Sequence, residues 1–166
     1  MTNPPATVWI NGELIPADRA TVSVYDRGFT SGDGVFETVK VVHGVPFAIT
    51  RHLRRLAESA HIIGFAPPPD AHLREAVAAT VDANLARLGD LGRLRVTLTA
   101  GRPQGSGSVP TRGGSDLTLV LTADPQTPHP GELKVVSVPW PHNERGPLVG
   151  AKTTSYADNL AVLEQV

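Results

Sequence analysis

Apolar and polar residues alternate in a strand-like pattern at the start of the chain. Residues 8–10 and 13–15 flank Asn11-Gly12, and an Asn-Gly pair supplies the positive φ angles of a tight hairpin turn. Residues 35–42 are rich in β-branched side chains and predict a longer strand, which a His-Gly turn reverses into residues 45–49. The pattern therefore predicts two antiparallel strand pairs.

A helical period replaces this alternation further along the chain. Apolar residues recur every three or four positions after Thr50, which predicts a helix with Thr50 as its N-cap and Gly64 at its end. A run of prolines interrupts the chain, and Asp70 caps a second helix that Gly89 or Gly92 ends. Strands followed by helices predict an α/β fold of stacked α+β layers.

The strand pattern returns in the second half of the chain. Residues 93–99 and 116–122 alternate between polar and apolar side chains, as a half-buried strand does. Residues 101–114, which lie between them, are rich in glycine and serine and contain few apolar side chains. We therefore expect a long loop that joins two strands.

A proline-rich stretch at residues 123–131 is the best candidate for a linker between domains. It would divide an N-terminal α/β domain, residues 1–122, from the start of a C-terminal domain, residues 132–166. In this second part, residues 133–138 predict a strand and residues 156–166 a helix. So small a piece is not expected to bury enough apolar area to fold unaided, so we read the second domain as largely missing from the chain.

Composition excludes several classes of function. The 166 residues include 15 Lys and Arg against 16 Asp and Glu, so no net charge favours nucleic acid or an anionic membrane as a partner. There is no cysteine, and the 6 histidines lack paired ligand spacing, so a metal site is not expected. Neither a signal peptide nor an apolar stretch of membrane-spanning length is visible, and the expected location is cytoplasmic.

Lys152 is the first candidate for chemistry. It follows an uncharged run, residues 146–151, in which Gly150 and Ala151 would leave room for a flat ring. Burial disfavours the charged form of a lysine amine, which can then attack a carbonyl and hold a Schiff base. Taken alone, however, such a lysine is more often an ordinary solvated side chain.

A second motif lies well upstream of Lys152. Residues 25–41 read Tyr-Asp-Arg-Gly-Phe-Thr-Ser-Gly-Asp-Gly-Val-Phe-Glu-Thr-Val-Lys-Val, and residues 46–56 contain the run His52-Leu53-Arg54-Arg55-Leu56. Together with the lysine segment, in this order and at this spacing, they resemble the class IV (fold type IV) aminotransferase family of pyridoxal-phosphate enzymes. That family includes branched-chain and D-amino-acid aminotransferases and aminodeoxychorismate lyase. The resemblance runs from about Val8 to the last residue.

The resemblance implies pyridoxal 5'-phosphate as the cofactor. Lys152 stands where the family's Schiff-base lysine stands, and it would also carry the proton between substrate and cofactor. Arg55 falls on the arginine that binds the cofactor phosphate, although without the motif it would read as a surface residue of an amphipathic helix. His52 is expected to pack and hydrogen-bond near Arg55. In the family the acidic partner of the pyridine nitrogen lies further on, beyond Val166.

The resemblance also implies residues that contact the substrate. Phe36 would face the substrate side of the cofactor, and its alternative is an ordinary core position. Arg102 lies in the predicted loop, where D-amino-acid aminotransferases carry an Arg and a His for the substrate carboxylate. No histidine follows Arg102 before His129, which puts D-specificity in doubt. Tyr156 would steady the lysine loop beside the substrate, with a core role as the alternative.

Three glycines in the upstream motif, Gly28, Gly32 and Gly34, predict a chain that turns tightly or passes close to another segment. Their spacing fits neither the P-loop nor the dinucleotide-binding fingerprint, so nucleotide binding is not expected.

The favoured interpretation is an enzyme, a pyridoxal-phosphate-dependent aminotransferase that acts on small-molecule amino acids and 2-oxo acids. The first alternative is aminodeoxychorismate lyase, which uses the same lysine and cofactor to release pyruvate and 4-aminobenzoate. The second is a non-catalytic fragment or interaction module. The resemblance further implies a homodimer, with the active site between two domains and loops that reach across from the partner.

Overall fold

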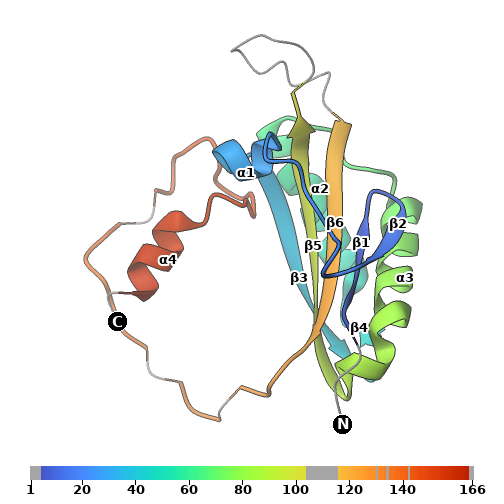
Figure 1. Ribbon diagram of the computed structural model, residues 1–166. Coiled ribbons are helices and arrows are strands. Elements are labelled where there is room, and N and C mark those ends of the chain that lie inside the picture. The colour runs from blue at the N-terminus through green and yellow to red at the C-terminus, as the bar shows by residue number, and fades with distance from the viewer. Residues whose placement is uncertain (1–4, 104–115, 130, 134, 142, 165–166) are drawn as a thin grey trace.

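The computed structural model describes residues 5–103, 116–129, 131–133, 135–141 and 143–164 (Figure 1). Its centre is a sheet of six strands in the order β2-β1-β6-β5-β3-β4, and every neighbouring pair in it is antiparallel. The strands are β1 (Thr7–Ile10), β2 (Glu13–Pro16), β3 (Gly34–Val42), β4 (Val45–Pro46), β5 (Leu91–Arg102) and β6 (Asp116–Pro125). The helices are α1 (Arg27–Ser31), α2 (Ile49–Ile63), α3 (Asp70–Leu88) and α4 (Ala157–Leu163).

The helices α2 and α3 cover one face of this sheet and form the second layer (Figure 1). Successive strand residues point to opposite faces, so alternate positions of β3 and β5 are buried under the helices. The fully buried side chains at the interface include Val35, Val39, Val41, Leu94, Val96 and Leu98 from the strands and Leu53, Leu56 and Leu73 from the helices. The predicted α/β layered fold is confirmed.

Most of the predicted elements are present, and their ends show where the prediction was wrong. The Asn11-Gly12 hairpin forms with both residues at positive φ, 48° and 106°. Helix α2 begins at Ile49 with Ala48 as its N-cap, and Thr50 does not cap it. The Thr50 hydroxyl instead accepts a hydrogen bond from Arg74 Nη2, at 3.1 Å, so it joins α2 to α3.

The short helix α1 was not predicted from the sequence. Asp26, whose side chain is buried, caps it by accepting a hydrogen bond from Gly28 N at 2.7 Å. The same carboxylate accepts the hydroxyl protons of Thr99 and Thr118 at 3.0 and 2.6 Å. Asp26 therefore ties the start of α1 to β5 and β6, and this long-range tie leaves no periodic pattern in the sequence.

The chain after the sheet differs most from the prediction. Strand β6 continues to Pro125, inside the predicted linker. The described residues of 133–138 form no strand, and Leu133 and Val135 are 70% and 90% exposed. A strand needs a hydrogen-bonded neighbour, and the described part of the chain offers none there. The predicted C-terminal helix is α4, and Figure 1 shows it beside the β3 side of the sheet.

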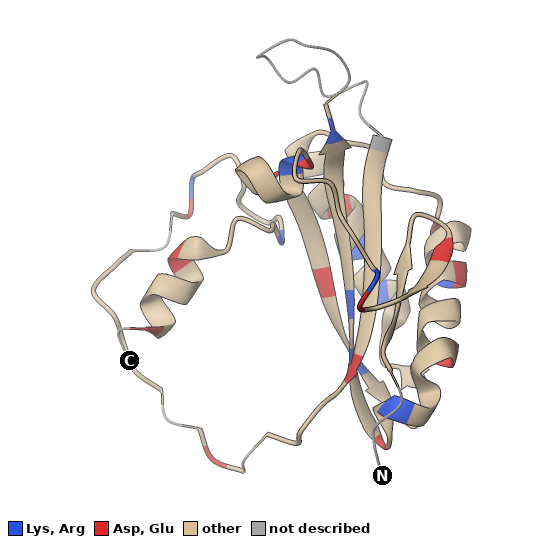
Figure 2. Cartoon of the chain, viewed as in Figure 1, with Lys and Arg blue, Asp and Glu red and all other residues tan. Residues whose placement is uncertain are grey.

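Charged residues are spread over both layers, with acidic and basic side chains interspersed (Figure 2). This distribution agrees with the balanced composition. None of the helices within the described ranges has the length and apolar character that a membrane span requires.

Candidate functional site

The lysine segment is bonded to the outer edge of β3. Phe36 N donates to Lys152 O at 3.0 Å, and Thr154 N donates to Gly34 O at 2.8 Å. These bonds form an isolated antiparallel bridge at the end of β3 that β4 leaves unpaired. Two motifs far apart in the sequence are thus brought together by backbone hydrogen bonds, which fix the position of Lys152 relative to Phe36.

Two glycines make this close approach possible. A Cβ atom at Gly34 would lie 3.0 Å from both Leu98 O and Thr154 Oγ1, and one at Gly32 would lie 2.6 Å from Ser155 Oγ. Gly32 also has a φ of 66°, which favours glycine. The hydroxyls of Thr154 and Ser155 both donate to Gly32 O, at 2.8 and 3.1 Å. The predicted close passage of another segment is confirmed at Gly32 and Gly34.

The side-chain amine of Lys152 lies against two aromatic rings. Its Nζ is 4.2 Å from the centroid of the Phe36 ring and 5.4 Å from that of Tyr156. The two rings meet edge to face, with centroids 5.5 Å apart. Within the described residues no carboxylate pairs with Nζ. The structure therefore places Phe36, Lys152 and Tyr156 together, and no ion pair with another described residue holds the amine.

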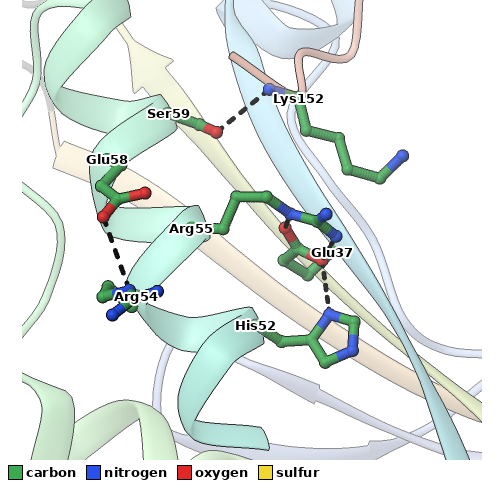
Figure 3. A network of polar contacts seen from close by, with 7 residues as sticks. All are labelled: Glu37, His52, Arg54, Arg55, Glu58, Ser59 and Lys152. Carbon is green, nitrogen blue, oxygen red and sulfur yellow. Dashed lines mark hydrogen bonds and ion pairs between the residues drawn. The ribbon is translucent and has the colours of Figure 1, made fainter. Parts of the chain in front are cut away.

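Helix α2 contacts the same segment through Ser59. The fully buried Ser59 Oγ accepts a hydrogen bond from Lys152 N at 3.0 Å (Figure 3). Residues four positions apart share one face of a helix, so Arg55 lies one turn from Ser59 on this face. Figure 3 shows the Arg55 side chain extending from α2 to Glu37 and the Lys152 side chain extending from the lysine segment, whose backbone meets Ser59.

Arg55 is bound to a buried carboxylate. Its Nε and Nη2 donate to the two oxygens of Glu37 at 2.5 and 2.6 Å. His52 Nδ1 lies 2.7 Å from Glu37 Oε2. Glu37 is fully buried, whereas the Arg55 and His52 side chains are 50% and 21% exposed. His52 is thus a hydrogen-bonding residue near Arg55, as predicted, and its partner is the carboxylate that also binds Arg55.

The charges of this cluster reinforce one another. Burial raises the pKa of Glu37, but the hydrogen bonds and positive charges of Arg55 and His52 outweigh burial, and the pKa lies below its ordinary value. The hydrogen bond to Glu37 in turn raises the pKa of Arg55. Both groups are therefore charged at neutral pH. The Arg55 guanidinium keeps its positive charge, together with the N–H donors that Glu37 does not engage.

Sequence reasoning missed Glu37 and Arg95. Glu37 alternates with Val35 and Val39 on the helix-facing side of β3, so a carboxylate between two valines of the predicted strand was the available signal. The guanidinium carbon of Arg95 lies 3.9 Å from the centroid of the Phe36 ring, and burial and the charge of Arg93 lower the pKa of Arg95. The available signal for Arg95 was its place as a polar residue in the alternating polar and apolar pattern of residues 93–99.

Arg102 lies apart from this cluster in its contacts. It is the exposed last residue of β5, and it makes no hydrogen bond or ion pair with the described residues of the site. The rest of the predicted specificity loop, residues 104–115, is outside the described residues. The parts of the chain that the structure describes contain no group of three His, Asp or Glu side chains that could hold a metal ion.

Comparison with known proteins identifies the family. Residues 34–166 match the family described as amino-transferase class IV. The chain belongs to the class IV aminotransferase family. A bifunctional aminodeoxychorismate lyase / D-amino acid transaminase from Mycobacterium tuberculosis is 31% identical over 94% of this chain and 55% of its own length.

Solved structures of class IV aminotransferases share the fold. The fold IV transaminase from Curtobacterium pusillum superposes with a TM-score of 0.81 at 29% identity, over 96% of this chain and 59% of its own. A hypothetical aminotransferase from Mycobacterium tuberculosis in a PLP-bound form gives 0.73 at 28%, over 96% and 57%. The chain thus spans little more than half the length of these relatives, and about a fifth, 22%, of a branched-chain-amino-acid aminotransferase-like protein from Arabidopsis thaliana.

Proposed function

We propose that this protein is a pyridoxal-phosphate-dependent aminotransferase that moves an amino group between an amino acid and a 2-oxo acid. The observation that carries the proposal is the Lys152 amine, which faces Phe36 and Tyr156 and lacks a carboxylate partner within the described residues. Relatives named as transaminases support it, as does the PLP-bound structure of one of them.

The residues present fit this cofactor. Pyridoxal phosphate supplies an aldehyde that bonds to a lysine amine and a ring that acts as an electron sink. Lys152 offers the amine. Arg55 offers a half-exposed guanidinium, and its Nη1 donors are not used by Glu37. A planar cation with paired donors suits a phosphate group, so Lys152 and Arg55 would hold the two ends of the cofactor.

The surrounding side chains have distinct roles in this proposal. Lys152 Nζ accepts and returns a proton at the substrate α-carbon, a step that requires an amine outside an ion pair. Phe36 and Tyr156 exclude water from that amine and shape the substrate side. Arg95, over the Phe36 ring, provides a cation for a substrate carboxylate. The Arg102 loop stays a proposed determinant of substrate preference.

The proposal is tested at Lys152. Borohydride treatment of the cofactor-loaded protein should attach the cofactor irreversibly to the peptide that contains Lys152, as read by mass spectrometry. Lys152→Ala should lose both the labelling and turnover, because a covalent bond to a lysine amine needs that amine. The control is Lys40→Ala, at an exposed position of β3, which should keep both. Labelling at Lys40 in the wild-type protein would overturn the proposal.

A second reaction deserves a direct comparison, because the relative from Mycobacterium tuberculosis carries both a lyase and a transaminase name. Lyase chemistry would release pyruvate from aminodeoxychorismate without any 2-oxo acid. Aminotransfer would instead require 2-oxoglutarate or another 2-oxo acid. Measuring pyruvate release and amino transfer side by side distinguishes the two reactions of the same lysine.

We also propose that the protein forms a homodimer. The uncharged end of β3 offers little surface for an interface, because Val35 is fully buried in the core. Exposed apolar side chains lie instead at Val24, Tyr25 and Phe29, which are 66%, 67% and 77% exposed. Such a group of exposed apolar residues is typical of an interface. A strictly monomeric protein in sedimentation experiments would contradict this part of the proposal.

A further inference from the structure

Glu37 occupies a position where an apolar residue would be expected. It lies on the helix-facing side of β3, between the fully buried Val35 and Val39, and is itself 0% exposed. Removing a carboxylate from water is costly, and the attraction of its partners often fails to exceed that cost. A buried ion pair therefore contributes little to the free energy of folding by itself, so stability alone does not explain why Glu37 and Arg55 are paired in this geometry.

The geometry fixes the orientation of one guanidinium. Glu37 engages Arg55 on one edge, through Nε and Nη2 (Figure 3). A guanidinium has five N–H donors in a rigid plane, so a carboxylate that holds this edge leaves the Nη1 donors and the second Nη2 hydrogen to point away from it. His52 contacts Glu37 Oε2 and holds the carboxylate in turn.

We propose that Glu37 is a positioning residue, whose buried carboxylate fixes the Arg55 guanidinium so that its remaining donors face the cofactor phosphate. The inference rests on the proposed function, since it takes Arg55 as the phosphate ligand. A free arginine side chain samples many rotamers, and ordering it on binding weakens the complex. Glu37 removes that cost by ordering Arg55 in advance.

Two effects of Glu37 on a phosphate have opposite signs. Its negative charge repels the phosphate, whereas its hold on Arg55 favours binding. Glu37→Gln removes both effects together, so it is the less informative change. Glu37→Asp keeps the charge but withdraws the carboxylate by one methylene, so it can no longer reach both Nε and Nη2. Glu37→Asp therefore tests the positioning role separately.

The experiment compares two ligands of the cofactor-free protein, pyridoxal phosphate and pyridoxal, which lacks the phosphate. Glu37→Asp should weaken binding of pyridoxal phosphate by about 10- to 30-fold, the scale of freeing one arginine side chain. Binding of pyridoxal should change by less than about twofold on the same scale. The matched control is Glu58→Asp, because Glu58 pairs with Arg54 on the same helix at 3.6 Å but is 62% exposed, and both affinities should stay unchanged.

The outcomes are separable. If wild-type protein binds pyridoxal phosphate and Glu37→Asp binds it equally well, the positioning role is overturned and the proposed function stands. An equal loss of affinity for both ligands would show that Glu37 supports only the fold, and would also overturn it. Failure of the wild-type protein to bind pyridoxal phosphate would overturn the proposed function and, with it, this inference. Should Glu37→Asp unfold, Glu37→Gln keeps the side-chain shape and takes its place. The proposal makes the hold on Arg55 the larger of the two opposed effects, so Glu37→Gln should still lower the affinity for pyridoxal phosphate relative to pyridoxal, though by less than Glu37→Asp, and an unchanged ratio of the two affinities would overturn the role.

Discussion

The two sides of the candidate site are built by different means. The side that carries Arg55 belongs to the core, where Glu37 and Ser59 are fully buried between β3 and α2. The side that carries Lys152 is held by a few hydrogen bonds, two of them backbone bonds to the edge of β3 and the others to Ser59 and to Gly32 O. Helix α4, which follows it, has no buried residue. The reactive amine is thus attached to a well-packed layer by a segment that packs little itself.

This difference indicates that the stability of the fold and the placement of Lys152 depend on different contacts and can be changed separately. Core packing of the sheet and helices sets the free energy of unfolding, because most buried apolar area lies there. The lysine segment depends on a few hydrogen bonds and on the space above Gly32 and Gly34. Segments with few apolar contacts open at lower free energy than the core. We therefore expect local opening at Lys152 without unfolding of the sheet.

The largest effect should come from a change in the core. Leu56 is 0% exposed and Leu160, on α4, is 57% exposed. Leu56→Ala should lower the free energy of unfolding by about 2–5 kcal/mol, because it leaves a cavity. Leu160→Ala should change it by about 0.5 kcal/mol or less. Urea denaturation measures both changes. A large loss of unfolding free energy for Leu160→Ala would contradict the comparison, because α4 would then belong to the cooperative core.

An effect of intermediate size on stability is expected when acid protonates Glu37. Its pKa in the folded protein lies below the ordinary value of 4.5, so the stability that comes from its ionisation is fully present above that pH. This stability is lost as the pH falls below 4.5 through the lower folded pKa. Glu37→Gln should therefore be less stable than wild type at neutral pH.

The stability gap between the two proteins should narrow as the pH falls below 4.5. Urea midpoints at a series of pH values measure it. Glu58→Gln, which changes an exposed carboxylate on α2, is the control and should track wild type. A gap for Glu37→Gln that stays constant with pH would show that charge at Glu37 does not contribute.

The layers of the fold could be predicted because their strands and helices show the regular spacing of apolar residues that is typical of each element. The β3, β5 and β6 strands and the α2 and α3 helices all lie close to their predicted positions, since one buried face determines each pattern. The strand predicted at 133–138 was wrong, because β-branched residues favour a strand only where a neighbour completes it. Helix α1 was missed because it depends on Asp26, whose partners lie on β5 and β6.

The site was predictable only in part, and for a related reason. Lys152 and Arg55 came from motif resemblance, which gives residues but not contacts. The contacts of the site all join separate elements. Glu37 on β3 binds Arg55 on α2, Ser59 on α2 binds the backbone of Lys152, and Arg95 on β5 lies over the Phe36 ring on β3. Such contacts depend on strand register and helix rotation, which no local pattern in the sequence encodes. The roles of the site residues remain proposals, and the predicted boundary at 123–131 stays a prediction.

The smallest effect should come from Ser59, and it bears most directly on the comparison. Ser59→Ala removes the acceptor of Lys152 N and leaves the sheet intact. A net hydrogen bond contributes about 0.5–1.5 kcal/mol, and the lower end applies where water can replace the lost partner. Hydrogen exchange at the Lys152 amide should therefore speed up by about two- to fivefold, on the scale of that energy, while the urea midpoint barely moves. Ser31→Ala is the control, because the Ser31 hydroxyl is exposed and donates to Arg27 O within α1, away from Lys152. If Ser59→Ala instead lowered global stability as much as Leu56→Ala, the lysine segment would belong to the core, and the two sides of the site would not differ as argued.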